Sequence, residues 1–317
     1  MHVLTGFLGA GKTTLLNRIL TEQQSERIAV LVNEFGDVPI DGRLIVRATD
    51  ELIELSNGCV CCTIRGDLTR TLGELLAKRR RLFGPESFQR IVLETSGLAS
   101  PGPVLQTLIL QPELAAEAEA AGVVALTHAA RTSEELEGHP EAREQLGYAD
   151  LILLNHTDRT DSAGLDAAEQ SIRKHNALAP IERTSRADIP TQRILTLEPL
   201  VSGNIDLERA HAAHTTGAGT VVLRSESPLD LHTLKIWLQF LATRRTHEIW
   251  RMKGVLNCTD RTEAVVLQAV YQWLEIGPGE EDPPDTSVLV LIGRDLDGEE
   301  LQRGWAAVTG APRPTPD

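Results

Sequence analysis

Apolar runs alternate with amphipathic stretches over the first two thirds of the chain. Runs of aliphatic residues with the length and composition of buried strands occur at 3–4, 27–32, 88–94, 122–126 and 149–154, with shorter ones at 51–55 and near 181. Between them, apolar residues recur at helical spacing, as in 15–20 and 68–76. This alternation predicts an α/β fold, a mostly parallel sheet covered by helices on both faces.

A different pattern begins after residue 219. We expect a strand at 220–224, a helix at 229–242, strands near 248–257, 264–273 and 287–293, and a helix at 299–308. This β-α-β-β-β-α order predicts a second, smaller α+β domain. A stretch of small residues at 211–219 separates the two patterns and is typical of a linker. We therefore expect domains at 1–210 and 219–317.

The segment Gly-Phe-Leu-Gly-Ala-Gly-Lys-Thr-Thr at 6–14 lies between the first predicted strand and the first predicted helix. Its spacing is that of a phosphate-binding loop, in which glycines let the backbone aim N–H groups at phosphate oxygens. Lys12 is expected to bridge the β- and γ-phosphates, and Thr13 to offer its hydroxyl to Mg²⁺. The predicted nucleotide-binding residues here are Gly6, Gly9, Ala10, Gly11, Lys12, Thr13 and Thr14. The fold is thus expected to be that of a P-loop NTPase.

Carboxylates follow the second predicted strand, at the edge of the sheet where ligands of such folds bind. The loop at 33–42, called the switch loop below, carries Glu34, Asp37 and Asp41. In a nucleotide-binding protein this loop can reach the γ-phosphate and Mg²⁺, so any of the three carboxylates is a candidate for holding a metal or its waters. An ordinary solvated turn explains any single one of them about equally well.

The third predicted strand ends in Glu94 of a Glu-Thr-Ser-Gly sequence. An acid at this position orients Mg²⁺ and its waters, and the backbone N–H of Gly97 can reach the γ-phosphate. GTPases commonly have Asp at this acid position, and here it is Glu. We predict Lys12, Glu94 and Gly97 as the catalytic group. No residue is an obvious general base, so positioning and charge stabilisation are expected to carry the chemistry.

The tetrapeptide Asn-His-Thr-Asp follows the strand at 149–154, where GTPases carry the guanine-reading signature Asn-Lys-x-Asp. Asp158 can accept hydrogen bonds from guanine N1–H and the 2-amino group, which adenine does not supply, while Asn155 would brace the loop and the base edge. His156 replaces the usual Lys and lacks its aliphatic stem, but its ring can stack on the base. Thr184 and Ser185 are expected beside the base. The sequence predicts GTP rather than ATP.

Three of the four cysteines, Cys59, Cys61 and Cys62, directly follow an Asn-Gly turn signal. Thiolates suit Zn²⁺ or another soft-to-borderline divalent ion. In an extended run Cys62 would point away from the other two, so the remaining ligand would come from the switch loop or from water. A redox pair and buried small hydrophobes are the alternative interpretations.

The overall charge narrows the range of partners. A net charge of −14 argues against nucleic acid and anionic membrane surfaces. No apolar run approaches the ~20 residues that span a bilayer. The first strand begins at once, leaving no room for a signal peptide, and the clustered thiols favour a reducing compartment. We expect a cytoplasmic protein.

Five segments together resemble the CobW-type metallochaperone GTPases. They are Gly-Phe-Leu-Gly-Ala-Gly-Lys-Thr-Thr-Leu-Leu at 6–16, Asn-Glu-Phe-Gly at 33–36, Asn-Gly-Cys-Val-Cys-Cys at 57–62, Glu-Thr-Ser-Gly-Leu-Ala-Ser-Pro at 94–101 and Gly-Tyr-Ala-Asp at 147–150. The sequence also resembles the CobW C-terminal domain, at residues 251–254 and 287–293. The resemblance covers nearly the whole chain, and the Cys-x-Cys-Cys sequence beside a phosphate-binding loop is its most specific element.

The resemblance implies a slow GTPase that uses Mg²⁺, holds Zn²⁺ or Co²⁺, and transfers that ion to a client apoprotein. GTP and Mg²⁺ would order the switch loop, and hydrolysis would relax it and release the metal. Carried over by motif, Cys59, Cys61 and Cys62 would be the metal donors, and Lys12 and Thr13 would hold phosphate and Mg²⁺. Together with the carboxylates and the base-reading signature predicted above, the candidate metal-site residues are Cys59, Cys61, Cys62, Thr13, Glu34, Asp37 and Glu94, and the candidate base-site residues are Asn155 and Asp158. The long histidine-rich stretch of some members is absent, so bulk metal storage is not expected.

Two alternatives belong to other functional classes. One is a GTP-dependent assembly factor that binds an enzyme without carrying metal, its cysteines being structural. The other is a small-molecule kinase, which leaves the cysteine cluster unexplained. A nucleotide-dependent dimer also stays open.

Overall fold

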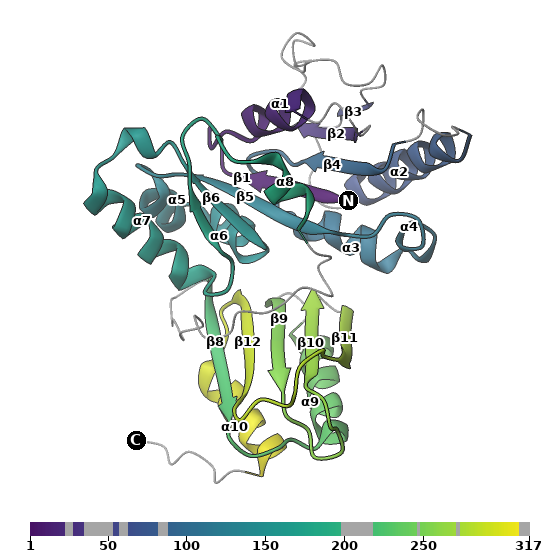
Figure 1. The fold of residues 1–317 in the computed structure, drawn as a ribbon, viewed down its shortest axis with the longest axis vertical. Helices are drawn as coiled ribbons and strands as arrows, with labels where there is room; N and C mark the ends of the chain where they lie inside the picture. Colours follow the sequence, from purple (N-terminus) through teal and green to yellow (C-terminus); the bar gives the residue numbers. More distant parts are fainter. Residues whose placement is uncertain are drawn as a thin grey trace. The chain divides into compact units, whose positions relative to one another are not determined.

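The structure is a computed structural model of the 317-residue chain. It describes residues 1–22, 28–34, 53–56, 63–81, 88–197, 218–245, 248–270 and 273–310. The chain forms two compact units (Figure 1). The first comprises Met1–Ser171 with Ala179–Leu200, and the second Ile172–Leu178 with Val201–Asp317.

The first unit contains a seven-stranded sheet in the order β3-β2-β4-β1-β5-β6-β7 (Figure 1). The strands are β1 His2–Gly6, β2 Ile28–Glu34, β3 Ile53–Ser56, β4 Arg90–Glu94, β5 Gly122–His128, β6 Leu151–Asn155 and β7 Ile181–Arg183. Every neighbouring pair is parallel. The apolar runs at 3–4, 27–32, 88–94, 122–126 and 149–154 form the five central strands, and those at 51–55 and near 181 form the edges. The predicted α/β fold is confirmed.

Helices connect these strands in turn. They are α1 Lys12–Glu22, α2 Thr63–Arg81, α3 Gly102–Leu110, α4 Pro112–Ala115, α5 Thr132–Gly138, α6 Pro140–Gly147, α7 Ser162–His175 and α8 Thr191–Leu195, with the 3₁₀ turn η2 at Thr157–Arg159. The apolar faces of α1 and α8 share one core with the sheet, exemplified by the buried Leu16, Leu126 and Ile194. This packing fixes the start of α1 at the carboxyl end of β1. Among the described helices, none is long and apolar enough to cross a membrane.

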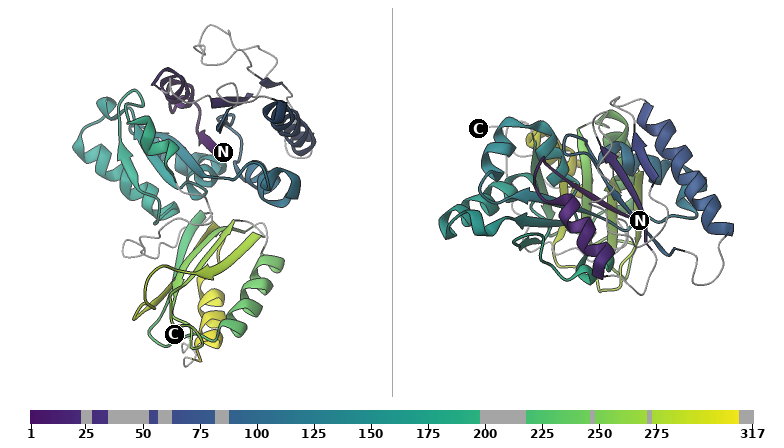
Figure 2. Two further views of the ribbon diagram at one scale, coloured as in Figure 1. Left: turned by 45° about the vertical axis from the view of Figure 1, so that its right-hand side comes forward. Right: turned by 90° about the horizontal axis from the view of Figure 1, so that it is seen from above.

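The second unit has an antiparallel five-stranded sheet in the order β11-β10-β9-β12-β8. Its elements are β8 Ala218–Ser225, α9 Leu231–Arg244, β9 Ile249–Leu256, β10 Val265–Val270, β11 Trp273–Pro278, β12 Ser287–Arg294 and α10 Gly298–Thr309. Both helices cover one face of the sheet (Figure 2). The buried Leu238 of α9 and Trp305 of α10 belong to the core formed there. The predicted α+β class of this unit is confirmed.

The prediction of one strand near 264–273 was wrong in one respect. The segment is followed by a second strand, so that β10 and β11 form a hairpin in which Val270 lies opposite Trp273. Tyr271 and Gln272, between them, lie outside the described residues. This connection contains none of the residues that usually announce a turn, Gly, Pro, Asn, Asp or Ser. The element order is therefore β-α-β-β-β-β-α.

Candidate nucleotide site

The phosphate-binding loop connects β1 to α1 through three glycines with positive φ: Gly6 at 140°, Gly9 at 74° and Gly11 at 105°. Residues other than glycine rarely adopt these positive φ angles. Space also requires glycine, because a Cβ atom on Gly6 would lie 2.2 Å from the Leu126 carbonyl oxygen, and one on Gly11 would lie 2.4 Å from Asn155 Nδ2. The loop therefore lies tightly against β5 and β6, and it opens α1 with the N-terminal end available to an anion.

Lys12 lies across the loop and is 8% exposed. Its Nζ donates to the carbonyl oxygens of Gly6 at 2.8 Å and Phe7 at 3.2 Å. These carbonyls hold the ammonium group inside the loop, where the phosphate oxygens of a nucleotide would compete for it. The position agrees with the role predicted for Lys12.

Thr13 and Glu94 are 81 residues apart in sequence, yet Thr13 Oγ1 donates to Glu94 Oε1 at 2.8 Å. They meet because β1 and β4 are neighbours, with Leu4 opposite Glu94. The Glu94 side chain is buried. A hydroxyl and a carboxylate beside a phosphate-binding loop are the oxygen donors that Mg²⁺ prefers, so the residues present fit this ion.

The segment after β4 lies against the phosphate-binding loop. A Cβ atom on Gly97 would be 2.6 Å from Leu8 Cδ2 and 3.0 Å from the Leu8 nitrogen. From α6, the buried Gln145 donates through Nε2 to the carbonyl oxygens of Gly97 at 3.1 Å and Ala99 at 3.0 Å. This side chain, which the sequence did not single out, holds the segment close to where a γ-phosphate would bind.

Asn155 ends β6 and is completely buried. Its Nδ2 donates to the Ala10 carbonyl oxygen at 2.8 Å, and its Oδ1 accepts from the Ala187 N–H at 2.9 Å. One amide thus connects the phosphate-binding loop to the segment between β7 and α8. These two bonds are compatible with the bracing role predicted for Asn155, which stays a prediction.

Asp158 lies in η2 beside that same segment. Ser185 Oγ donates to Asp158 Oδ1 at 2.5 Å, and Thr157 Oγ1 donates to the Thr184 carbonyl oxygen at 3.1 Å. The hydrogen bond from Ser185 holds the pKa of the Asp158 carboxyl below its usual range. The carboxylate is half exposed and ionised, ready to accept hydrogen bonds.

His156 has a left-handed backbone with φ of 59°, and its ring stacks on His128. The ring centroids are 4.4 Å apart and the planes differ by 20°. Burial lowers the pKa of His128, and the neighbouring His156 and Arg131 lower it further. His128 ends β5, and a single histidine after a strand gave no signal in the sequence. The His128 ring is thus a flat support for the His156 ring.

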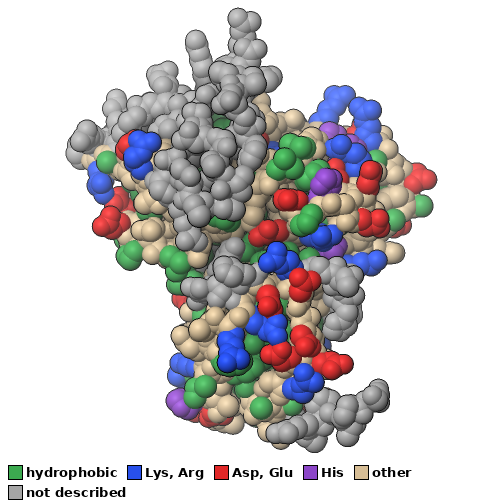
Figure 3. All heavy atoms as spheres, turned by 180° about the vertical axis from the view of Figure 1, so that it is seen from behind, with side chains coloured by type: hydrophobic (Ala, Val, Ile, Leu, Met, Phe, Trp, Pro, Cys, Tyr) green, Lys and Arg blue, Asp and Glu red, His purple; other side chains and the backbone are tan. Residues whose placement is uncertain are grey.

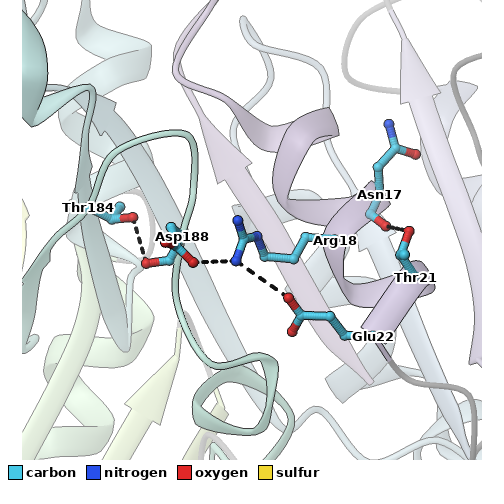
Figure 4. A network of polar contacts seen from close by, with 6 residues as sticks. All are labelled: Asn17, Arg18, Thr21, Glu22, Thr184 and Asp188. Carbon is cyan, nitrogen blue, oxygen red and sulfur yellow. Dashed lines mark hydrogen bonds and ion pairs between the residues drawn. The ribbon is translucent and has the colours of Figure 1, made fainter.

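A polar network joins α1 to the segment between β7 and α8 (Figure 4). Arg18 points from α1 to the carboxylate of Asp188, which is 170 residues away in the sequence. Its Nη1 also lies 3.4 Å from Glu22 Oε1. Thr184 Oγ1 donates to the Asp188 carbonyl oxygen at 3.0 Å. Because these ion pairs are partly exposed, each stabilises the fold by only about 0–1 kcal/mol. Their effect is to fix the position of the 184–188 segment.

The remaining predicted metal residues lie mostly beyond the described part of the chain. Cys59, Cys61, Cys62 and Asp37 are outside it, and of Glu34 only the backbone, at the end of β2, is described. Within the described ranges, no group of three or more His, Cys, Asp or Glu is arranged to hold a metal ion. In the sequence, the cysteine segment lies between the end of β3 and the start of α2.

Acidic and basic side chains are interspersed on the face shown in Figure 3. Arg183, with Asp166 at 2.7 Å and Glu169 at 2.6 Å, illustrates how positive charge is paired at the surface. Such mixed charge is typical of a solvated protein surface.

Comparison with known proteins places these features in a family. Residues 1–183 match the family model described as CobW/HypB/UreG, nucleotide-binding domain, and residues 218–309 match that of the cobalamin synthesis protein cobW C-terminal domain. The two family models thus match the two parts of the chain for which the sequence predicted a CobW-type domain.

Individual relatives are similar over nearly their full length. The chain is 33% identical to the zinc chaperone YjiA of Escherichia coli (strain K12), covering 96% of this chain and 97% of the relative. It is 33% identical to the zinc chaperone CobW of Pseudomonas aeruginosa, covering 93% and 87%. The crystal structure of Zn(II)-bound YjiA GTPase from E. coli superposes with a TM-score of 0.77 at 28% identity, over 97% of this chain and 98% of that one.

Proposed function

Because the chain belongs to the CobW/HypB/UreG family of GTPases, we propose that it is a metallochaperone that binds Zn²⁺ and delivers it to a client apoprotein under control of GTP. GTP and Mg²⁺ are the cofactors of its nucleotide-binding domain. The names of the relatives, zinc chaperones, support Zn²⁺ as the cargo in preference to Co²⁺.

One observation carries the proposal: the register of three neighbouring strands at one edge of the sheet. Glu94 of β4 lies opposite Val32 of β2, and Glu34 at the end of β2 lies opposite Ser56 at the end of β3. From typical strand spacings, Ser56, the last residue of β3, lies on the order of 12 Å from Glu94, the proposed Mg²⁺ ligand, and the cysteine segment follows Ser56 in the sequence. The switch loop follows β2, which is the strand between β3 and β4. A change in the conformation of this loop would therefore affect both the cysteine segment and Glu94.

In this proposal the nucleotide site works by positioning. Lys12 and the loop amides hold the β- and γ-phosphates, and Thr13 and Glu94 hold Mg²⁺, which neutralises charge that develops on the leaving phosphate. The Gly97 segment contacts the γ-phosphate, Asp158 binds the guanine edge, and Asn155 braces the loops around it. Loss of the γ-phosphate then releases the Gly97 segment and the switch loop.

The metal would be held by thiolates of Cys59, Cys61 and Cys62, with Glu34 or Asp37 completing the ligand set. Sulfur donors suit Zn²⁺, and a carboxylate from the switch loop would make the ligand set depend on the nucleotide. Thiolate ligands need a compartment that keeps them reduced, so we place the activity in the cytoplasm. We also propose the domain limits 1–210 and 219–317, and a client protein as the partner, with nucleotide-dependent dimerisation as a second association to test.

Replacement of Cys61 tests this proposal directly. Cys61→Ala removes one thiolate from the metal site and leaves the phosphate-binding loop unchanged. We expect Zn²⁺ affinity to fall by at least tenfold, measured by chelator competition, with GTP affinity unchanged by calorimetry. Cys258→Ala is the matched control, because Cys258 is a buried cysteine of the second unit. Equal loss of Zn²⁺ and GTP binding in the Cys61 variant, or unchanged Zn²⁺ binding, would contradict the proposal.

A further inference from the structure

One side of α5 lies along the phosphate-binding loop. Arg131, Glu135 and His139 follow one another at intervals of four residues, the spacing that places side chains on one face of a helix. Arg131 Nη2 donates to the Leu8 carbonyl oxygen at 3.2 Å. The His139 ring packs on the ring of Phe7, with centroids 4.4 Å apart. The loop is thus contacted at both ends of this short helix.

Between these contacts lies Glu135, which is 6% exposed. Its Oε1 is 3.4 Å from Arg131 Nε, and its Oε2 is buried without a hydrogen-bond partner in the described part of the protein. Burial raises the pKa of the Glu135 carboxyl to about 7. The charged groups that face it are Arg131 and Glu134 of the same helical segment, and Lys12 of α1. An unsatisfied carboxylate costs stability, which calls for a functional reason.

The bond from Arg131 to Leu8 has a direct geometric consequence. The carbonyl of Leu8 and the N–H of Gly9 belong to one planar trans peptide, so the two point in opposite directions. Because Arg131 holds the carbonyl, the Gly9 N–H points away from the guanidinium, where it can donate to a phosphate oxygen. Space around this peptide is limited, since a Cβ atom on Gly9 would lie 3.2 Å from Arg131 Nη2.

We propose that Arg131 and Glu135 are positioning residues of the GTPase reaction: Arg131 fixes the Leu8–Gly9 peptide so that its N–H faces the phosphates, and ionised Glu135 holds Arg131 in place. The proposal deepens the GTP-hydrolysing part of the proposed function and rests on it. It does not depend on the cysteine segment or on the identity of the metal.

Two properties follow from the burial of Glu135. In the pH range near 7, protonation of its carboxyl weakens the hold on Arg131, so GTP turnover rises with pH across this range. The free energy of unfolding changes with pH in the direction opposite to that of GTP turnover. The folded protein retains a proton that the unfolded chain releases between pH 4.5 and about 7, so this group lowers stability as pH rises through that window.

Steady-state kinetics of the full chain with Mg²⁺ and GTP test the proposal. For Arg131→Ala we expect kcat to fall about tenfold with a smaller change in KM, because a misdirected N–H loses its interaction mainly in the transition state. Arg131→Lys restores most of the rate, since an ammonium group also donates to a carbonyl. Arg143→Ala is the matched control: Arg143 also donates to backbone carbonyl oxygens, but to those of Leu136 and Glu137 in α5 and not to one of the phosphate-binding loop.

Glu135→Gln separates positioning from folding. We expect this variant to lose the rise in turnover near pH 7, while its melting temperature relative to wild type increases more at pH 8 than at pH 5. Unchanged kcat and KM in Arg131→Ala, or a wild-type pH profile in Glu135→Gln, would overturn the proposal alone. A wild-type chain that does not hydrolyse GTP would overturn the proposed function and this proposal with it.

Discussion

At the scale of single residues, Asn155 connects two separate loops of the candidate site. Its Nδ2 donates to the Ala10 carbonyl, and its Oδ1 accepts from the Ala187 N–H. Both partners are backbone groups, and the amide has a donor and an acceptor on separate atoms, so it can bind one group on each side. The phosphate-binding loop and the 184–188 segment are thereby held in one arrangement before a nucleotide binds.

Replacing Asn155 should therefore affect both stability and nucleotide affinity. Asn155→Ala leaves two backbone groups without their partner, and we expect it to lower the free energy of unfolding by about 3 kcal/mol. GTP affinity should fall at least tenfold at temperatures where the variant is still folded. Denaturant unfolding and calorimetric titration measure the two effects.

Asn176→Ala is the control, because Asn176 is equally buried but precedes β7, at the amino end of the sheet. That variant should lose stability and keep its GTP affinity. Equal losses of GTP affinity in both variants would show that Asn155 acts on the fold alone.

Asp158 is the residue on which base selectivity is expected to depend. Its carboxylate is accessible and already ionised, with Ser185 fixing one oxygen. Asp158→Asn places a donor where guanine presents its 2-amino donor, whereas xanthine presents an oxygen there. We expect GTP affinity to fall by about 100-fold and affinity for xanthosine triphosphate to rise, compared by competition binding. Unchanged preference for GTP would exclude Asp158 as the residue that reads the base.

At the scale of elements, local signals in the sequence were sufficient for much of the site. The glycine spacing of the phosphate-binding loop, the apolar run before Glu94 and the run before Asn155 each specify a strand and the position of the loop after it. Because the sheet is parallel, knowing these strands already places their carboxyl ends at one edge. This is why the sequence alone could predict that Lys12, Thr13, Glu94 and Asn155 lie at one edge of the sheet.

Contacts between distant segments could not be predicted in this way. The ion pair of Arg18 with Asp188 and the stacking of His128 on His156 join residues whose neighbours in sequence carry no matching signal. The hairpin of β10 and β11 was missed for a local reason, since its connection lacks turn residues. The cysteine segment could be recognised only from its spacing and its resemblance.

The two short helices α5 and α6 show how an overlooked local signal can matter. The segment between β5 and β6 forms two helices and not one. Pro140 starts α6, and His139 before it is extended, as expected for a residue preceding proline. The break ends α5 where His139 reaches the Phe7 ring. A continuous helix would leave this contact with the phosphate-binding loop unmade.

At the scale of the whole molecule, the proposed function joins two chemistries along one sheet edge. β1 at the centre carries the phosphate-binding loop, and β4, β2 and β3 follow outward in order. Hard oxygen donors for Mg²⁺ lie near the centre, and the soft thiolates follow the outermost strand in sequence. The switch loop belongs to the strand between them. Coupling between GTP and metal is therefore the central claim.

The most direct test is the Zn²⁺ affinity of the purified chain by competition with a chromogenic chelator, with and without a non-hydrolysable GTP analogue and Mg²⁺. Coupling predicts one site per chain, tightened at least tenfold by the nucleotide, which is a coupling free energy of about 1.4 kcal/mol. Lys12→Ala, which weakens phosphate binding, should lose this increase. Weak Zn²⁺ binding that is indifferent to the nucleotide would contradict the proposed coupling, and would leave a GTP-dependent assembly factor that does not transfer metal.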